Sequence, residues 1–249
     1  MPEQSLDQRK AYILATVVYE YIETGEPVGS QTLTQKYNLG VSSATVRNEM
    51  AELEAGGYLM QPHTSAGRVP SDTGYRTYVD ELMEPEKLAA AERRRIQDDL
   101  RDASRELDEI ITNATRVLGR LSNSLAFLTQ PNTERVSAAG TQNLLDQPEF
   151  HDLRKLRSIL RIIEEQKTLY DLVADAMSAE SPSVKIGHEL GSEELNDLSV
   201  VTVPYRFGER ATGMLSILGP RRMPYARLMA LAAGTAETLS EHLSEVELP

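Results

Sequence analysis

The sequence predicts an α+β protein with an N-terminal winged helix-turn-helix, a long connecting helix and a C-terminal antiparallel sheet with flanking helices. Three observations support this fold class. Residues 28–68 have the pattern of helix, turn, helix and hairpin; residues 96–121 repeat apolar side chains in steps of four and three; and several later runs are rich in β-branched residues. We therefore expect a winged-helix DNA-binding domain over residues 1–84, a long amphipathic helical segment over residues 85–129 and an α+β domain over residues 130–249.

The composition limits the compartment and the class of partner. The 249 residues include no Cys, no signal-peptide pattern and no apolar run of transmembrane length, so we expect a soluble cytoplasmic protein with no membrane partner. The net charge of -12 argues against a general nucleic-acid binder, because nonspecific affinity comes from neutralised phosphates. From Ser30 to Asn48, however, Lys36 and Arg47 occur without any acidic residue, so the expected contact surface is locally positive.

The first predicted helix supports the motif. Residues 5–8 resemble a capping box, and apolar residues then recur at helical spacing from Leu14 to Tyr21. Gly25 is expected to end this helix, because glycine tolerates the left-handed conformation of a C-terminal cap.

A second helix and a tight turn follow. Ser30 is expected to cap a helix over residues 31–36, because its hydroxyl can accept a hydrogen bond from the free backbone donors of the first turn. Asn38 and Gly40 tolerate a positive φ, so the chain is expected to turn there.

The third helix carries the predicted reading face. Ser42 or Ser43 caps it, and the glycine pair at residues 56–57 ends it. The stripe that faces the core consists of Val46, Met50 and Leu53. The opposite face and its flanks offer small, amide and guanidinium groups of the kind that read base edges in a major groove, and these belong to Ala44, Thr45, Arg47 and Asn48.

A short hairpin completes the motif. Residues 58–60 are expected to form a strand, residues 64–67 the tip and residues 68–69 the return strand. No acidic residue occurs among the polar groups of this wing, so it can approach phosphate. The predicted DNA-binding residues are therefore Ser42, Ser43, Ala44, Thr45, Arg47, Asn48, His63, Thr64, Ser65 and Arg68.

After a further helix that starts near Ser71, the chain carries a heptad-like pattern, called here the apolar seam. Its members are Ile96, Leu100, Ala103, Leu107, Ile110, Ala114, Val117 and Leu121, extended by Leu128. The spacing favours a helix-helix contact along one helix from Glu86 to Leu128. The alternative is that this helix lies on its own domain.

The remaining residues alternate between helical and strand-like segments. We expect strands at 136–139, 184–186, 198–203 and 211–218, the last two forming an antiparallel hairpin around Gly208. Helices are expected at residues 153–163, where Leu156, Leu160 and Ile163 share a face, then through residues 169–177, and finally from residue 224 onward.

No pattern in the sequence indicates catalysis, a metal or a cofactor. The four histidines, His63, His151, His188 and His242, are far apart and have no helical partner at i+4, so a zinc site is not expected. Glu149 and His151 fit a loop-to-helix cap better than an acid-base pair. Because no phosphate-binding loop or nucleophile motif is present, we do not expect an enzyme.

Three separated stretches match one protein family in the order of that family. They are residues 28–80, with VGSQTL, SSATVRNEMAELEAGGYL and HTSAGRVPSDTGYRTYVD; residues 140–150, with GTQNLL and QPEF; and residues 203–227, with VPY and GPRRMPYAR. In these stretches the chain resembles HrcA, the bacterial heat-shock transcription repressor family.

The resemblance implies a transcription repressor that binds an inverted-repeat operator on double-stranded DNA upstream of chaperone operons, and that a chaperonin helps to keep active. It also implies a GAF-like C-terminal domain with an inserted dimerising segment. Only about a dozen residues lie between Leu128 and Gly140, where the family carries far more, so we expect a short form with a reduced GAF-like domain. A homodimer would then be held partly by the apolar seam.

Two alternatives to the repressor remain open. Because the GAF-like fold often holds small ligands, the chain could be a winged-helix regulator that senses a metabolite through its C-terminal domain. The winged helix could also serve protein contact alone.

Overall fold

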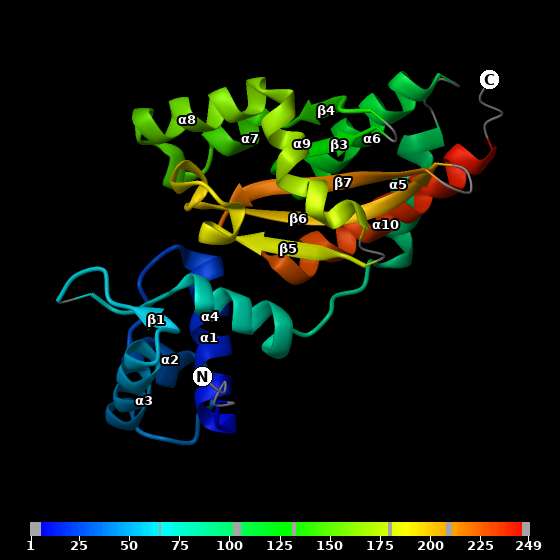
Figure 1. The fold of residues 1–249 in the computed structure, drawn as a ribbon. Coiled ribbons are helices and arrows are strands. Elements are labelled where there is room, and N and C mark those ends of the chain that lie inside the picture. The colour runs from blue at the N-terminus through cyan, green and yellow to red at the C-terminus, as the bar shows by residue number, and fades with distance from the viewer. Residues whose placement is uncertain are drawn as a thin grey trace. The chain divides into compact units, whose positions relative to one another are not determined.

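The structure, a computed structural model, describes residues 6–64, 66–101, 106–130, 133–178, 181–207 and 211–245. The chain divides into two compact units, residues 1–84 and 85–249, and each combines helices with antiparallel strands (Figure 1). The expected α+β class is therefore confirmed.

The first unit places helices around a two-stranded sheet. In chain order its elements are α1 (Gln8–Thr24), α2 (Ser30–Lys36), α3 (Ser43–Ala55), β1 (Leu59–Met60), β2 (Val69–Pro70), α4 (Asp72–Thr77) and the π-helix η1 (Tyr78–Leu82). Strands β1 and β2 are antiparallel, with Leu59 opposite Pro70 and Met60 opposite Val69.

Two helix starts differ from the sequence prediction. Helix α1 is capped by Asp7, whose carboxylate accepts from the Lys10 backbone N–H at 2.9 Å, whereas Ser5 lies outside the described residues. Helix α2 begins at Ser30 itself, with Gly29 as the residue before it, so Ser30 is not the cap. The Ser30 side chain is buried instead, which a capping pattern in the sequence does not reveal.

The turns follow the glycines rather than the asparagine. Gly40 has a φ of 66° between α2 and α3, and Gly57, the second residue after α3, has a φ of 81°. Among the described residues with a side chain, Asn123 alone has a positive φ, so Asn38 does not adopt the left-handed conformation that its side chain would tolerate.

The hairpin is pinned at its base to the segment before α2. Val28 and Arg68 exchange two backbone hydrogen bonds, of 2.8 Å and 2.9 Å. A Cβ on Gly67 would lie 2.5 Å from the Val28 backbone, so only glycine permits this close approach. The bridge therefore determines where the base of the hairpin lies relative to α2.

A buried carboxylate joins α1 to the end of α2. The Glu20 side chain is 6% exposed, forms an ion pair with Lys36 and accepts a hydrogen bond of 2.9 Å from the Tyr37 hydroxyl. The Lys36 hydrogen bond, together with that of Tyr37, lowers the pKa of Glu20. Burial and the Glu20 contact raise the pKa of Tyr37 to about 12. These contacts orient the end of α2 on α1.

The second unit is built on a five-stranded antiparallel sheet of order β4-β3-β7-β6-β5. Its strands are β3 (Leu125–Thr129), β4 (Val136–Ala139), β5 (Ser183–Ile186), β6 (Leu198–Phe207) and β7 (Ala211–Pro220). Its α-helices are α5 (Ala90–Arg101), α6 (Leu107–Ser122), α7 (Thr141–Leu145), α8 (Leu153–Glu164), α9 (Gln166–Ala174) and α10 (Tyr225–Glu245). Short 3-10 turns complete it at η2 (Pro148–Phe150), η3 (Asp175–Ser178), η4 (Gly187–Leu190) and η5 (Glu193–Leu195).

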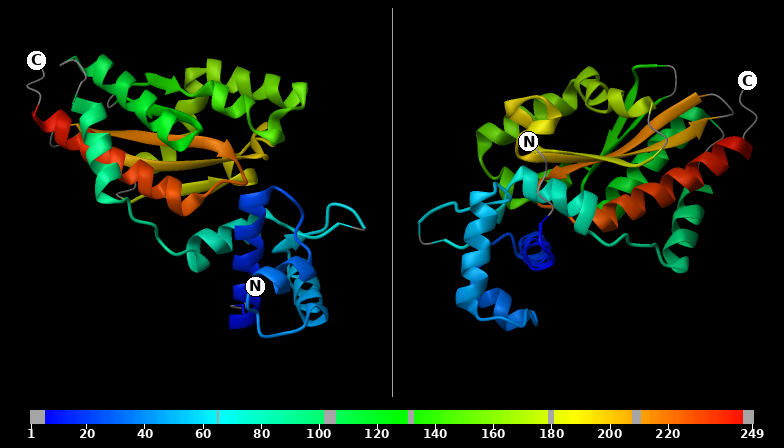
Figure 2. Two further views of the ribbon diagram at one scale, coloured as in Figure 1. Left: turned by 180° about the vertical axis from the view of Figure 1, so that it is seen from behind. Right: turned by 60° about the horizontal axis from the view of Figure 1, so that its bottom comes forward.

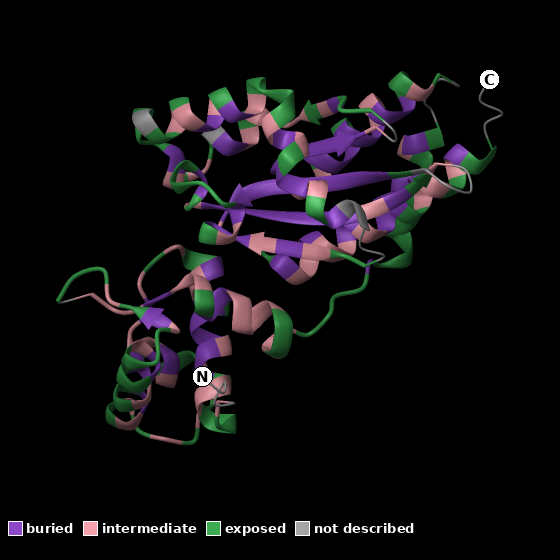
Figure 3. Ribbon diagram, in the orientation of Figure 1, coloured by how far each residue is buried: buried purple, intermediate pink, exposed green. Residues whose placement is uncertain are grey.

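Helices cover both faces of this sheet. Helix α10 packs along β6 on one face, with α6 beside it and α5 against α10 (Figure 2). On the opposite face, Phe127 and Val200 of the sheet join Leu169 and Val173 of α9 in one buried cluster. The three central strands β3, β7 and β6 are therefore largely buried on both sides, as their colour in Figure 3 shows, whereas the edge strands β4 and β5 are buried only at some positions. The expected β6–β7 hairpin is confirmed, although Gly208 at its turn lies outside the described residues.

The prediction of one long connecting helix is wrong. Helix α5 ends at Arg101, α6 begins at Leu107, and the run that contains Leu128 is strand β3. Five described members of the apolar seam are 4% exposed or less, namely Ile96, Leu100, Ile110, Ala114 and Val117, whereas Leu107 and Leu121 are partly buried. Because α5 and α6 pack against α10 and the sheet, the same chain covers the seam. Most of the seam is therefore covered within one chain, which leaves little of it for the dimer contact that the spacing suggested.

Helix α8 also buries a different stripe from the one expected. Ile159 and Ile162 are buried, whereas Leu156, Leu160 and Ile163 are only partly buried and Leu153 is 70% exposed. The apolar residues of α8 occupy a broad face, so spacing alone does not tell which part of that face meets the core.

Candidate nucleic-acid interface

Helix α3 separates a buried stripe from an exposed polar face. Val46, Met50 and Leu53 are each at most 1% exposed, as expected. On the other side Ala44, Arg47 and Asn48 are exposed. The polar face of α3 is thus free of contacts that would cover it within the described part of the first unit.

The start of α3 is organised by Ser42. Its hydroxyl accepts from the Thr45 backbone N–H at 3.2 Å and lies 3.0 Å from the Thr45 hydroxyl. Of the two serines considered as caps, Ser42 therefore fills the role, and Ser43 is the first helical residue. The Thr45 side chain is partly buried in this cap, so it is less accessible than Asn48 one turn later.

The hairpin tip is held by a residue that the sequence pattern did not single out. The Gln61 side-chain amide donates to the carbonyl of Ala66 at 2.9 Å and to that of Thr64 at 3.2 Å. His63 and Thr64 are exposed on this tip, and Ser65 lies outside the described residues. Gln61 thus positions the polar residues of the hairpin from inside the loop.

Arg68 lies at the base of the hairpin and is paired. Its Nε donates to the Glu54 carboxylate at 2.9 Å, and its guanidinium NH2 group lies 2.8 Å from the same oxygen. Only 16% of the Arg68 side chain is exposed. No acidic residue occurs from Ala55 to Ser71, and the neutralising carboxylate is that of Glu54 on α3, fourteen residues before Arg68.

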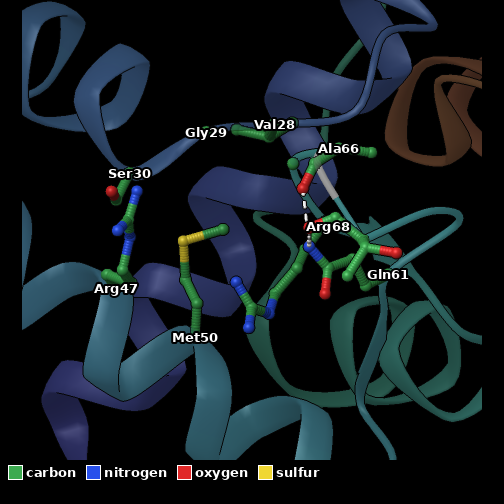
Figure 4. Close-up of a pocket in the computed structure, with 10 residues that line it drawn as sticks. Val28, Gly29, Ser30, Arg47, Met50, Gln61, Ala66 and Arg68 are labelled. Carbon is green, nitrogen blue, oxygen red and sulfur yellow. Dashed lines mark hydrogen bonds between the residues drawn. The ribbon is translucent and has the colours of Figure 1, made fainter.

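A pocket of about 430 Å³ opens between α3, the start of α2 and the hairpin (Figure 4). Arg47 and Met50 contribute to it from α3, and Gln61 and Arg68 contribute from the hairpin. Figure 4 shows the Arg47 side chain extending from α3 toward Ser30. The structure therefore brings Arg47, Thr64 and Arg68 of the predicted site around one pocket, while Asn48 is not part of its lining.

Other classes of site find little support in the described part of the chain. No group of three or more His, Cys, Asp or Glu residues there is arranged to hold a metal ion. None of the described helices is both long enough and apolar enough to cross a membrane. Glu149 forms an ion pair with Arg222 at 2.6 Å, which joins η2 to the segment before α10 and gives this carboxylate a structural role.

Comparisons with known proteins identify one family. A family model described as the HrcA protein C terminal domain matches residues 73–229. Two curated proteins, both named heat-inducible transcription repressor HrcA, are each 30% identical to this chain. The one from Pelotomaculum thermopropionicum aligns over 97% of this chain and 98% of its own length, and the one from Symbiobacterium thermophilum over 95% and 98%. These alignments span 340 and 335 positions, more than the 249 residues of this chain, so the relatives carry residues without a counterpart here.

One solved structure shares the fold along nearly the whole chain. It is a crystal structure at 2.2 Å resolution of a hypothetical protein, with a TM-score of 0.78 and 23% sequence identity. The match covers 97% of this chain and 99% of that one.

Proposed function

The chain belongs to the HrcA family, and from this membership we propose that it is a DNA-binding transcription repressor whose repression is relieved by heat. The relatives are named as heat-inducible repressors, and a family match over most of the chain supports the same role here. We assign it no enzymatic activity.

The proposed DNA-binding module is the first unit. Helices α2 and α3 with the turn at Gly40 correspond to a helix-turn-helix, and the β1–β2 hairpin corresponds to the wing. The observation that carries this assignment is the exposed polar face of α3, opposite a fully buried apolar stripe. Such a helix can enter the major groove, where an Asn side chain can pair with both hydrogen-bonding groups of adenine.

A binding assay on Asn48→Ala tests the reading face. The protein is titrated against a duplex from the promoter region of a chaperone operon in its own genome, and against a shuffled duplex of equal length. Loss of a bidentate base contact should cost about 1 to 3 kcal/mol on the promoter duplex and little on the shuffled one. Unchanged affinity of a folded Asn48→Ala variant would show that Asn48 does not read the operator.

We further propose that the repressor acts as a homodimer on an inverted repeat. Two recognition helices related by a two-fold axis can read two half-sites on one side of the duplex, whereas a single acidic module would make too few contacts for tight binding. Because most of the described members of the apolar seam are buried within one chain, we place the main interface on another surface. Sedimentation of the parent protein, free and with the promoter duplex, determines the stoichiometry.

We propose that the second unit is a reduced GAF-like domain that connects repression to folding stress at chaperone operons. Heat that unfolds this unit would remove DNA-competent protein by mass action, and a chaperonin would restore it. In a reconstituted assay, purified chaperonin with ATP should raise the fraction of repressor that binds the promoter duplex. An unchanged fraction, starting from partly inactive repressor, would contradict this part of the proposal.

A further inference from the structure

The first unit neutralises nearly all of its own positive charge. Residues 1–84 contain six Lys or Arg side chains, and all six lie in the described ranges. Five of them form ion pairs with carboxylates of the same unit, namely Arg9 with Glu49, Lys10 with Asp7 and Glu52, Lys36 with Glu20, Arg68 with Glu54, and Arg76 with Asp80. Arg47 forms no ion pair with any residue that the structure describes.

The unpaired guanidinium also has a defined place. Arg47 is exposed on α3 and lines the pocket between α3, the start of α2 and the hairpin (Figure 4). The second guanidinium of this pocket, that of Arg68, is already neutralised by Glu54. The uncompensated positive charge at the pocket therefore belongs to Arg47. Side-chain hydrogen-bonding groups of Ser30, Gln61 and Thr64 surround the same space.

We propose that this pocket binds a phosphodiester group of the DNA duplex and that Arg47 is the residue that neutralises it. The proposal rests on the DNA-binding function inferred above and assigns a separate task within it. Arg47 anchors the backbone of the duplex, whereas Asn48, which is exposed and does not line the pocket, is left to read bases.

The geometry of a duplex favours a phosphate over a base at this position. The walls of the major groove are the sugar-phosphate backbones, so a helix in the groove and a hairpin beside it must enclose a backbone between them. A pocket of about 430 Å³ between those two elements meets that backbone. A guanidinium binds phosphate through two parallel hydrogen bonds. Arg47 can form them without breaking an ion pair to any carboxylate that the structure describes.

The salt dependence of binding tests the assignment. Each neutralised phosphate releases counterions and contributes about 0.9 to the slope of log affinity against log salt, so Arg47→Ala should lower the slope by about 1 per bound chain. Between about 50 mM and about 200 mM salt, the parent should then lose about 3.5-fold more affinity per chain than the variant. Arg47→Ala should weaken binding to the promoter duplex and to the shuffled duplex by similar factors, leaving their ratio unchanged.

Two further variants separate a local anchor from general charge. Arg9→Ala removes the same charge from a side chain that is 57% exposed and paired with Glu49, so it should keep the parent slope. Arg47→Lys keeps the charge at the pocket and should also keep the slope. Arg47 is exposed and alanine favours helix, so circular dichroism should show parent-like folding for Arg47→Ala.

The outcomes distinguish this proposal from the proposed function. If Arg47→Ala retains the parent slope, or if it lowers only the preference for the promoter duplex, Arg47 does not neutralise a phosphate and the inference is wrong. Equal changes in slope for Arg9→Ala and Arg47→Ala would mean diffuse charge rather than a pocket, which also overturns it. If the parent binds both duplexes equally, the proposed sequence-specific function fails, yet the slopes still test the phosphate site.

Discussion

The two units of this protein differ in how far apart in sequence their stabilising contacts lie. In the first unit the strands are two residues long, and its order depends on helix caps, the Val28–Arg68 bridge and ion pairs between neighbouring helices. In the second unit the ten-residue strands β6 and β7 form the centre of a sheet that helices cover on both faces, and residues 125–128 pair with residues 215–218.

This difference fits the proposed division between binding and regulation. The buried stripe of Val46, Met50 and Leu53 holds α3 in place while its polar face stays uncovered, which suits recognition of an external partner. A unit held by contacts between distant residues unfolds as a whole when its core is disturbed, because the strand pairs depend on one another. We therefore expect core substitutions in the second unit and cap or ion-pair substitutions in the first to differ in size.

The largest effect is expected from a charge in the core of the second unit. Leu100→Glu would bury an unpaired carboxylate where the parent side chain is 1% exposed, which should lower the free energy of unfolding by about 3 to 5 kcal/mol. Leu153→Glu is the matched control, because Leu153 is 70% exposed and its replacement should change stability little. Thermal unfolding followed by circular dichroism measures both.

Leu100→Glu also decides the role of the apolar seam. A stable, fully folded monomer obtained from a parent that sediments as a dimer would place Leu100 at an interface between chains and contradict the burial argument. Loss of folded second unit, without a folded monomer, agrees with burial in the same chain.

An intermediate effect is expected from the carboxylate that joins α1 to α2. Contacts with Lys36 and Tyr37 lower the pKa of Glu20, so its ionised form stabilises the folded state. This contribution is fully present above the unfolded pKa of about 4.3 and disappears as pH falls through the lower folded pKa. Glu20→Gln should therefore cost about 1 to 3 kcal/mol at neutral pH and approach no cost toward acidic pH.

Urea denaturation of the parent and of Glu20→Gln across this pH range measures the difference. The exposed Glu23 lies on the same helix, so Glu23→Gln serves as the control for removing one carboxylate. A cost of Glu20→Gln that is the same at pH 3 and pH 7 would rule out the ion pair as its source.

The smallest effect is expected at the start of α3. Ser42→Ala removes the side-chain acceptor of the Thr45 backbone N–H and should lower the free energy of unfolding by about 1 kcal/mol. Ser43→Ala changes the neighbouring serine inside the first turn, so it should cost less. Urea denaturation again measures both, and a larger loss for Ser43→Ala would reverse the assignment of the cap.

The sequence by itself determined the elements whose signals are local. The glycine at residue 25 and the glycine pair at 56–57 end helices, residues 136–139 form a strand, and the apolar stripe of α3 is buried where its spacing placed it. The family could also be recognised from three separated stretches. The structural inferences among these depend on residues close together along the chain, where propensity and periodicity act directly.

Only the tertiary structure decided what covers each surface. Helical spacing showed that the members of the apolar seam share a face. It did not show that α10, which lies far later in the chain, and the sheet would cover that face. Likewise, Glu54 neutralises Arg68 and Glu20 neutralises Lys36, while Arg47 at the pocket has no ion-pair partner among the residues that the structure describes. Periodicity reports which side chains point the same way, whereas burial and charge pairing depend on which distant segment arrives opposite them.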